Sequence, residues 1–167
     1  ERKNKIVKQM TGGVKTLLAG RGVDIHRGTA SLVTANRIAV KSATGTQEIT
    51  ADHVVLATGA AAWMPPGWAL DGERVIGSQE ALNLSHQPKR VAVLGGGVVG
   101  SEFACFFAAI GTQVTLIEML PRLVMGEDEE VSAALEREMK KHKIAVHLNT
   151  KVEDRKDNPD GSITLTL

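Results

Sequence analysis

The sequence contains a single cysteine, Cys105, among its 167 residues. One cysteine excludes an internal disulfide framework and fits a reducing, intracellular compartment such as the cytoplasm. No apolar run reaches the ~20 residues that a membrane-spanning helix requires, and no secretory or transit segment is visible. The formal net charge is only +1 and the basic residues form no long stripe, so nothing favours a nucleic-acid partner.

Motifs of bond-making catalysis and of metal binding are also absent. Cys105 is flanked by Phe103, Phe106 and Phe107, which favours a packing role over a reactive one. There is no G-x-S-x-G turn and no Walker lysine motif. Metal-ligand spacing is missing from all five histidines, namely His26, His53, His86, His142 and His147. We therefore expect neither a metal site nor a catalytic residue in this sequence.

The apolar content of 43% is that of a folded protein. Residues 4–19 have apolar side chains at a spacing of three to four, which predicts an amphipathic helix that Gly20 and Gly22 end. The sequence begins inside this helical pattern and stops inside a strand-like one. We therefore expect a piece of a longer protein.

Residues 23–57 change to a period of two. Three short alternating runs, 30–33, 37–41 and 47–50, predict a small antiparallel meander. The continuous apolar run 54–57 predicts a buried strand, which Thr58 and Gly59 end. Residues 61–76 contain Pro65-Pro66-Gly67 and no periodicity, so they predict a linker. A short helix is expected at 78–84, with Ser78 as its N-cap.

The remaining residues predict an α/β unit. Strands at 90–94, 113–117 and 144–148 alternate with helices at 101–110 and 127–143, and a hairpin over 150–167 turns at 158–161. Such alternation implies parallel strands with right-handed crossovers, a Rossmann-like βαβ fold. The acidic cluster 127–130 opens the second helix, where it complements the helix macrodipole.

The most informative motif is G-x-G-x-x-G at residues 95–100, between the first strand and the first helix of this unit. Gly95 permits a tight turn, Gly97 leaves space for a pyrophosphate, and Gly100 lets the helix pack closely on the strand. The free N–H groups at the helix start, around Val98 and Val99, favour negative charge. This context predicts a dinucleotide site, and a purely structural glycine-rich turn is the alternative.

Glu118 ends the second strand of the unit, 18 residues after Gly100. A carboxylate at this place accepts hydrogen bonds from the adenosine ribose and repels the 2′-phosphate of NADP, so it favours NAD. A solvated acid at a strand end is the alternative. Arg122 lies close in sequence and could instead favour a phosphate.

Glu102 is the only charged residue of the first helix. Its spacing is compatible with two roles: an acid of the first turn stabilised by the helix dipole, or a carboxylate that faces the nicotinamide end of the cofactor.

Four segments occur in the order and spacing found in one enzyme family: Gln9–Val14, Val54–Gly59, Gly95–Glu102 and Leu148–Val152. On these residues the sequence resembles the dihydrolipoamide dehydrogenases, which belong to the FAD-dependent pyridine nucleotide–disulfide oxidoreductases. The resemblance covers essentially the whole chain. It implies that 1–60 are part of an FAD-binding domain, 61–76 an interdomain linker and 77–167 most of an NAD-binding domain.

Several roles follow from the resemblance. Ala57, Thr58 and Gly59 match the strand end where the FAD domain approaches its flavin nucleotide. Glu102 matches a carboxylate near nicotinamide and flavin, which favours its functional interpretation. NADP-using relatives carry Arg at the positions of Glu118 and Val124, so the resemblance also favours NAD. Val98 stands where some relatives place a Tyr that gates the nicotinamide pocket, so no such gate is expected.

The family's FAD-binding glycine turn, redox cysteine pair and His–Glu base have no counterpart in this sequence. The resemblance implies that the intact enzyme is a homodimer that oxidises dihydrolipoamide carried on an acyltransferase, with FAD and NAD as cofactors. Its location would be the cytoplasm, or the mitochondrial matrix in a eukaryote. We expect the 167 residues alone to be inactive.

Three alternatives remain open at this stage. The parent enzyme could be another FAD-dependent disulfide reductase, of the mercuric or glutathione reductase type. The chain could be a non-catalytic NAD-binding module. A methyltransferase also uses a glycine turn and an acid after the second strand, but the meander and the segment 57–59 ahead of the βαβ unit argue against it.

Overall fold

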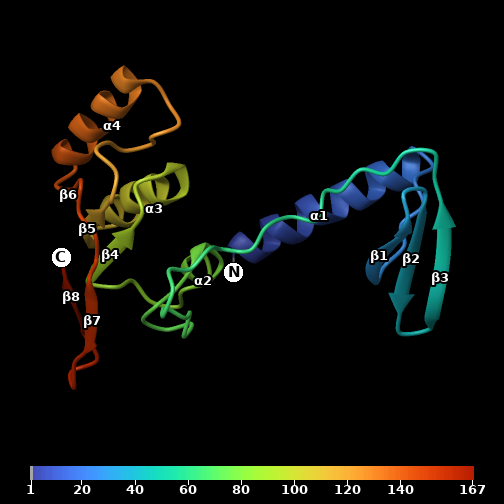
Figure 1. The fold of residues 1–167 in the computed structure, drawn as a ribbon, viewed down its shortest axis with the longest axis horizontal. Helices are drawn as coiled ribbons and strands as arrows, with labels where there is room; N and C mark the ends of the chain where they lie inside the picture. The colour runs from blue at the N-terminus through green and yellow to red at the C-terminus, as the bar shows by residue number, and fades with distance from the viewer. Residues whose placement is uncertain (1) are drawn as a thin grey trace. The chain divides into compact units, whose positions relative to one another are not determined.

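A computed structural model describes residues 2–167 of the chain. These residues divide into two compact units, unit 1 up to Ala60 and unit 2 from Ala61 to Leu167. Figure 1 shows the helices and strands of both units.

Unit 1 contains one helix and one antiparallel sheet. Helix α1 spans Arg2–Gly20, and the three strands are β1 (Thr29–Thr34), β2 (Arg37–Ser42) and β3 (Gly45–Thr50). The sheet order is β1-β2-β3, as expected of a meander. Gly22, with φ of +68°, follows the end of α1, and Val23 N–H donates to the Leu18 carbonyl at 3.0 Å. The predicted helix, its glycine end and the meander are confirmed.

The predicted buried strand at 54–57 is wrong. These residues form no regular structure, and Val55 and Leu56 are 86% and 69% exposed. A strand forms when a neighbour takes up its backbone N–H and C=O groups. In the described part of unit 1 the sheet consists of β1, β2 and β3 only, and none of them pairs with this segment.

Unit 2 is built on a parallel sheet. Its strands are β4 (Arg90–Leu94), β5 (Gln113–Ile117) and β6 (Ala145–His147), ordered β4-β5-β6. The register pairs Leu94 with Ile117, and Ile117 with His147, so the carboxyl ends of all three strands meet at one edge. The predicted Rossmann-like βαβ arrangement is confirmed.

Helices α3 (Val98–Ala109) and α4 (Glu129–Lys141) connect these strands and share one core with them. α3 begins three residues earlier than expected, because Gly97 rather than a later residue is its N-cap. Asp128 is the N-cap of α4 and accepts a hydrogen bond from Glu130 N–H at 2.9 Å. The core joins both helices to β5 and to the loop after it through Ala104, Phe107, Val114, Leu116, Leu123, Val124, Met139 and Ile144.

The packed face of α4 differs from its apolar spacing. Val131, Leu135 and Met139 stand four residues apart, which favours one apolar face. Val131 is nevertheless half-exposed, and Ser132 is buried instead, at 3% exposure. The Ser132 hydroxyl donates to the Leu123 carbonyl at 2.7 Å. A hydrogen bond to a buried carbonyl removes the cost of burying a hydroxyl, so the helix can turn this residue inward.

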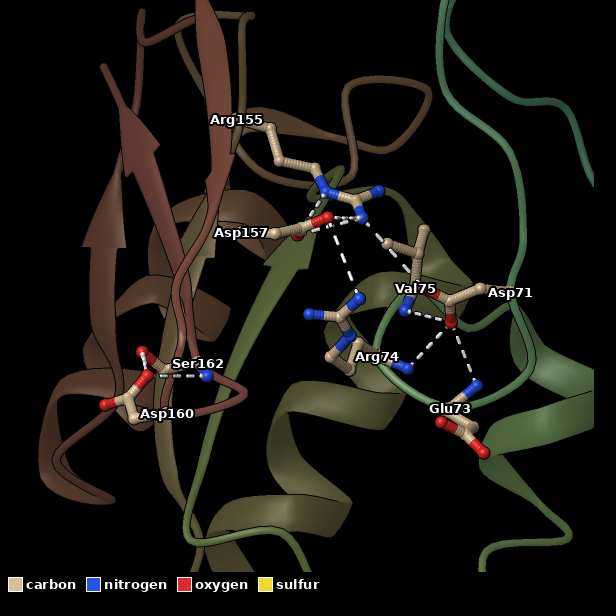
Figure 2. A network of polar contacts seen from close by, with 8 residues as sticks. All are labelled: Asp71, Glu73, Arg74, Val75, Arg155, Asp157, Asp160 and Ser162. Atoms are coloured by element: carbon tan, nitrogen blue, oxygen red, sulfur yellow. Dashed lines mark hydrogen bonds and ion pairs between the residues drawn. The ribbon is translucent and has the colours of Figure 1, made fainter.

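Residues 61–76 have no helix or strand, as expected, yet they are held on unit 2. Asp71 accepts three backbone hydrogen bonds, from Glu73, Arg74 and Val75, and Figure 2 shows this loop beside the hairpin strand β7. The short helix α2 (Ser78–Ala81) follows, with Gly77 rather than Ser78 as its N-cap. Gly77 N–H donates to the Glu80 side chain at 2.9 Å, so the first turn is capped from within.

The hairpin of β7 (Asp154–Asp157) and β8 (Ile163–Thr166) turns at the predicted place. Arg155 connects this hairpin to the loop 61–76. Its guanidinium binds Asp157 at 2.9 Å, lies 4.0 Å from Asp71, and stacks over the Trp68 ring at 5.7 Å (Figure 2 shows the polar part). The loop and the hairpin are therefore tied together by charge and by a cation–π contact.

Within residues 2–167, no helix is both long and apolar enough to cross a membrane.

Candidate functional site

The glycine turn lies between the end of β4 and the start of α3, at the carboxyl edge of the parallel sheet. Gly95 has φ of +107°, a conformation that L side chains rarely adopt. A Cβ at Gly100 would lie 1.9 Å from the Gly95 carbonyl oxygen, so helix and strand approach as closely as a glycine allows. A Cβ at Gly97 would meet nothing within 4 Å. Each glycine therefore has the local geometry that its position in the motif predicts.

Backbone donors are available at the same place. The first hydrogen bond of α3 runs from Ser101 N–H to the Gly97 carbonyl at 2.9 Å. The N–H groups of Val98, Val99 and Gly100 belong to the first helical turn, which has no acceptor for them inside the helix. Val98 and Val99 are 54% and 56% exposed. Free donors, the helix dipole and the open space at Gly97 together suit an anionic phosphate group.

Gly96 is not marked by the motif, yet three hydrogen bonds hold it in the turn. Its N–H donates to Glu118 Oε2 at 2.6 Å, and its carbonyl accepts from Val124 N–H at 2.8 Å and from the Ser101 hydroxyl at 3.2 Å. A Cβ at Gly96 would lie 2.6 Å from Leu123 Cδ2. Nothing in the sequence marks these contacts, because they join residues up to 28 positions apart.

Glu118 comes directly after β5 and reaches back to the glycine turn. Its carboxylate accepts Gly96 N–H on Oε2 and Leu120 N–H on Oε1, the latter at 2.7 Å. Its backbone is held by the neighbouring strand, since Glu118 N–H donates to the His147 carbonyl at 2.8 Å. A carboxylate oxygen has more than one acceptor position, so both oxygens keep capacity for a further donor.

Arg122, the possible phosphate ligand, is engaged elsewhere. Its guanidinium donates to the carbonyls of Glu127 at 2.7 Å and Met125 at 3.3 Å, and to the Ser132 hydroxyl at 3.2 Å. All three acceptors belong to the loop after β5 or to α4. The structure thus brings Glu118 to the glycine turn and turns the charge of Arg122 toward α4.

Glu102 is exposed on α3. It is the fifth residue of the helix, so it lies in the second turn and not in the first. The helix dipole acts mainly within the first turn. The interpretation of Glu102 as an acid stabilised at the helix start is therefore wrong, and a role toward the cofactor stays a prediction.

Ala57, Thr58 and Gly59 lie in the irregular segment of unit 1 and are exposed. Gly59 has φ of +76°, which makes it a turn residue. The regular elements of the described part of unit 1 are the helix and the meander alone, and the predicted role of 57–59 toward FAD stays a prediction. No group of three His, Cys, Asp or Glu side chains within residues 2–167 is placed to hold a metal ion.

Comparison with known proteins places this geometry in a family. The model of the family described as "Pyridine nucleotide-disulphide oxidoreductase" matches residues 1–167. This chain belongs to the pyridine nucleotide-disulphide oxidoreductase family. Members of this family depend on FAD and on NAD or NADP, and the family includes the branch that the four sequence segments resemble.

Several relatives in this family are dihydrolipoyl dehydrogenases. The enzyme of Acholeplasma laidlawii is 34% identical over 99% of this chain and 48% of its own length, and that of Chlorobaculum parvum is 36% identical over 91% of this chain and 33% of its own. The chain thus spans about a third to a half of the length of these oxidoreductases.

A solved structure in the family has a similar fold. The HOCl-induced flavoprotein disulfide reductase RclA of Escherichia coli matches with a TM-score of 0.83 and 26% identity, over 99% of this chain and 38% of its own.

Proposed function

We propose that this chain forms the NAD site of a flavoprotein that oxidises dihydrolipoamide through a redox disulfide and FAD and passes a hydride to NAD⁺. The observation that carries the proposal is the glycine turn closed by Glu118 at the end of the parallel sheet. The names and identities of the dihydrolipoyl dehydrogenase relatives support the choice of substrate.

The residues at the turn fit a dinucleotide. The pyrophosphate would lie over Gly97, where no atom occupies the space, and would accept from the N–H groups that open α3. The cofactor-binding residues are accordingly Gly95, Gly97, Val98, Val99 and Gly100.

Glu118 would distinguish NAD from NADP. Both of its oxygens can accept from ribose hydroxyls while they hold Gly96 and Leu120, and its negative charge repels a 2′-phosphate. Arg122 donates to the loop and to α4, and the position of Val124 is apolar and buried. The described surroundings of Glu118 therefore favour NAD.

Glu102 and the segment 57–59 would complete the cofactor contacts. Glu102 would act at the nicotinamide end, near the flavin, and Ala57, Thr58 and Gly59 would approach the FAD nucleotide. When bound, FAD accepts two electrons and NAD⁺ accepts a hydride. Cys105, the only cysteine, is half-buried on α3, so a redox cysteine pair would have to come from other residues. We expect the 167-residue chain alone to show no turnover.

A partner protein that carries dihydrolipoamide and a second subunit belong to the same proposal. Dihydrolipoamide would be presented on an acyltransferase, the intact protein would be a homodimer, and its compartment would be the cytoplasm or the mitochondrial matrix. A second candidate is a flavoprotein disulfide reductase with another substrate, which the likeness to the disulfide reductase RclA favours.

The test uses the full-length protein with dihydrolipoamide and either NAD⁺ or NADP⁺, and it compares Glu118→Arg with Glu136→Arg. Glu136 is an exposed acid of α4 and serves as a charge-matched control. We expect dihydrolipoamide-dependent NADH formation in the wild type, with NAD⁺ strongly preferred. Glu118→Arg should raise KM for NAD⁺ at least about tenfold, because it removes the ribose acceptor and the tie to Gly96, and should shift the preference toward NADP⁺.

Two results would contradict parts of the proposal separately. A wild type that reduces another disulfide but not lipoamide would favour the second candidate. If Glu118→Arg left the preference for NAD⁺ over NADP⁺ unchanged, Glu118 would not contact the nucleotide.

A further inference from the structure

The loop between β5 and α4, residues 118–128, contacts the glycine turn at Gly96. From its start, Glu118 accepts the Gly96 N–H; from its middle, Val124 N–H donates to the Gly96 carbonyl at 2.8 Å. Between them, Leu123 is 1% exposed and fills the space beside the Gly96 Cα. The position of the turn therefore depends on the conformation of this loop.

That conformation is strained at the point of contact. Val124 has φ of +42°, in the left-handed region, where a β-branched side chain is rare and strained. The strained residue is the one whose N–H reaches Gly96. Such a conformation persists only when the surroundings hold it by several contacts at once.

Val124 itself is buried, and its carbonyl accepts from Glu127 N–H at 2.8 Å. Arg122 adds three contacts to the residues around it. Its guanidinium donates to the carbonyls of Met125 and Glu127, on the far side of Val124, and to the Ser132 hydroxyl. Ser132 in turn donates to the Leu123 carbonyl at 2.7 Å, on the near side of Val124. A planar guanidinium reaches several acceptors in a fixed geometry, whereas a lysine ammonium is a single point charge on a flexible stem. Arg122 thus holds the loop on both sides of the strained residue.

We propose that Arg122 is a positioning residue for the dinucleotide: it holds the loop 118–128 so that Val124 and Glu118 set the glycine turn, and it does not bind the cofactor itself. This inference rests on the proposed dinucleotide site. A basic residue near Glu118 can have either of two roles: a ligand of the 2′-phosphate acts on NADPH alone, whereas a residue that sets the turn acts equally on both nucleotides.

The experiment compares Arg122→Met and Arg122→Lys with Arg137→Met, an exposed arginine of α4. NADH and NADPH are titrated separately against each full-length variant. We expect both Arg122 variants to raise Kd for the two nucleotides by the same factor, about tenfold for Arg122→Met, so that the ratio of the two affinities stays constant. Arg122→Lys should recover little of the loss, and Arg137→Met should leave both affinities unchanged.

A second measurement needs no nucleotide. Amide hydrogen exchange of the free protein should rise in peptides that cover 95–101 and 119–128 in Arg122→Met, and stay unchanged in the hairpin 154–166. Ser132→Ala, which removes the hydroxyl that donates to Leu123 and accepts from Arg122, should raise exchange in the same two peptides. This milder variant keeps the test available if Arg122→Met folds poorly.

Three results would overturn the inference. A loss of affinity for NADPH but not for NADH would show that Arg122 binds the 2′-phosphate. Unchanged affinities, or unchanged exchange at 95–101, would show that the turn does not depend on Arg122. If the wild type bound no NADH, the proposed function would fail, and the exchange data would still decide whether Arg122 holds the turn.

Discussion

Units 1 and 2 of this chain carry similar amphipathic patterns but bury them to very different extents. Helix α1 of unit 1 has apolar side chains at helical spacing, yet none of its described residues is buried, and Met10 and Leu17 are 64% and 61% exposed. Helix α4 of unit 2 has a comparable pattern and buries Met139 completely. The contrast shows that periodicity determines whether a helix forms, whereas burial depends on the surface that faces it.

The same contrast holds for strands. β5 in unit 2 is paired on both edges, and Val114 and Leu116 are 2% and 0% exposed. The apolar segment 54–57 in unit 1 has a similar composition, but it is unpaired among the described residues, and Val55 and Leu56 are exposed. Energetic consequences of substitution should therefore differ sharply between the two units.

The largest effect is expected in the core of unit 2. Leu116→Ala should lower the free energy of unfolding by about 2–5 kcal/mol, because it leaves a cavity among fully buried side chains. Leu56→Ala in unit 1 should change it by no more than about 0.5 kcal/mol. Denaturant unfolding followed by far-UV circular dichroism measures both units, and the fluorescence of Trp63 and Trp68 follows unit 2 alone. Equal effects at the two sites would mean that Leu56 is buried in solution.

A pair of glycines gives the next contrast. Gly100→Ala should cost about 1–3 kcal/mol and abolish measurable NADH binding, because its Cβ would collide with the Gly95 backbone oxygen. Gly12→Ala in α1 should stabilise the helix by about 0.5–1 kcal/mol, since nothing lies within 4 Å of the added methyl group. Unfolding curves and NADH titration check both. Unchanged stability and NADH affinity in Gly100→Ala would show that the turn does not require a glycine at this position.

The smallest effect is expected at the loop 71–75. Three backbone N–H groups, those of Glu73 and Val75 foremost, hold the pKa of Asp71 at about 2, below its ordinary value of 3.8. A lowered folded-state pKa stabilises the fold above the unfolded pKa, and the contribution is lost as the carboxylate is protonated. Asp71→Asn should therefore cost about 1 kcal/mol near pH 6, and the difference from wild type should shrink as pH falls from about 4 to about 2.

Melting temperatures of the wild type and of Asp71→Asn across this pH range measure the effect. Asp24→Asn, at an exposed acid of unit 1, is the matched control and should show no such difference. A difference for Asp71→Asn that grows as the pH falls would have the wrong sign for a carboxylate with a lowered pKa.

Local features of the fold were readily predictable. The order β4-α3-β5-α4-β6, the meander, the acidic start of α4 and the hairpin turn all follow from period, helix-end charge and turn residues, which act within a few positions. The errors arose where long-range contacts decide. Ser132 rather than Val131 faces the core because its hydroxyl donates to the Leu123 carbonyl. Gly77 rather than Ser78 is the N-cap of α2, and its N–H donates to the Glu80 side chain.

The sequence by itself determined the glycine turn and the strand and helix on either side of it, because glycine spacing and hydrophobic period are local properties. Only the tertiary structure decided which charged side chain contacts that turn. The parallel register of β4 and β5 brings Glu118 to Gly96, and the fold of the loop 118–128 carries the Arg122 guanidinium to Met125, Glu127 and Ser132. Both residues follow β5 within five positions, and backbone geometry, which one-dimensional spacing does not contain, sends them in different directions.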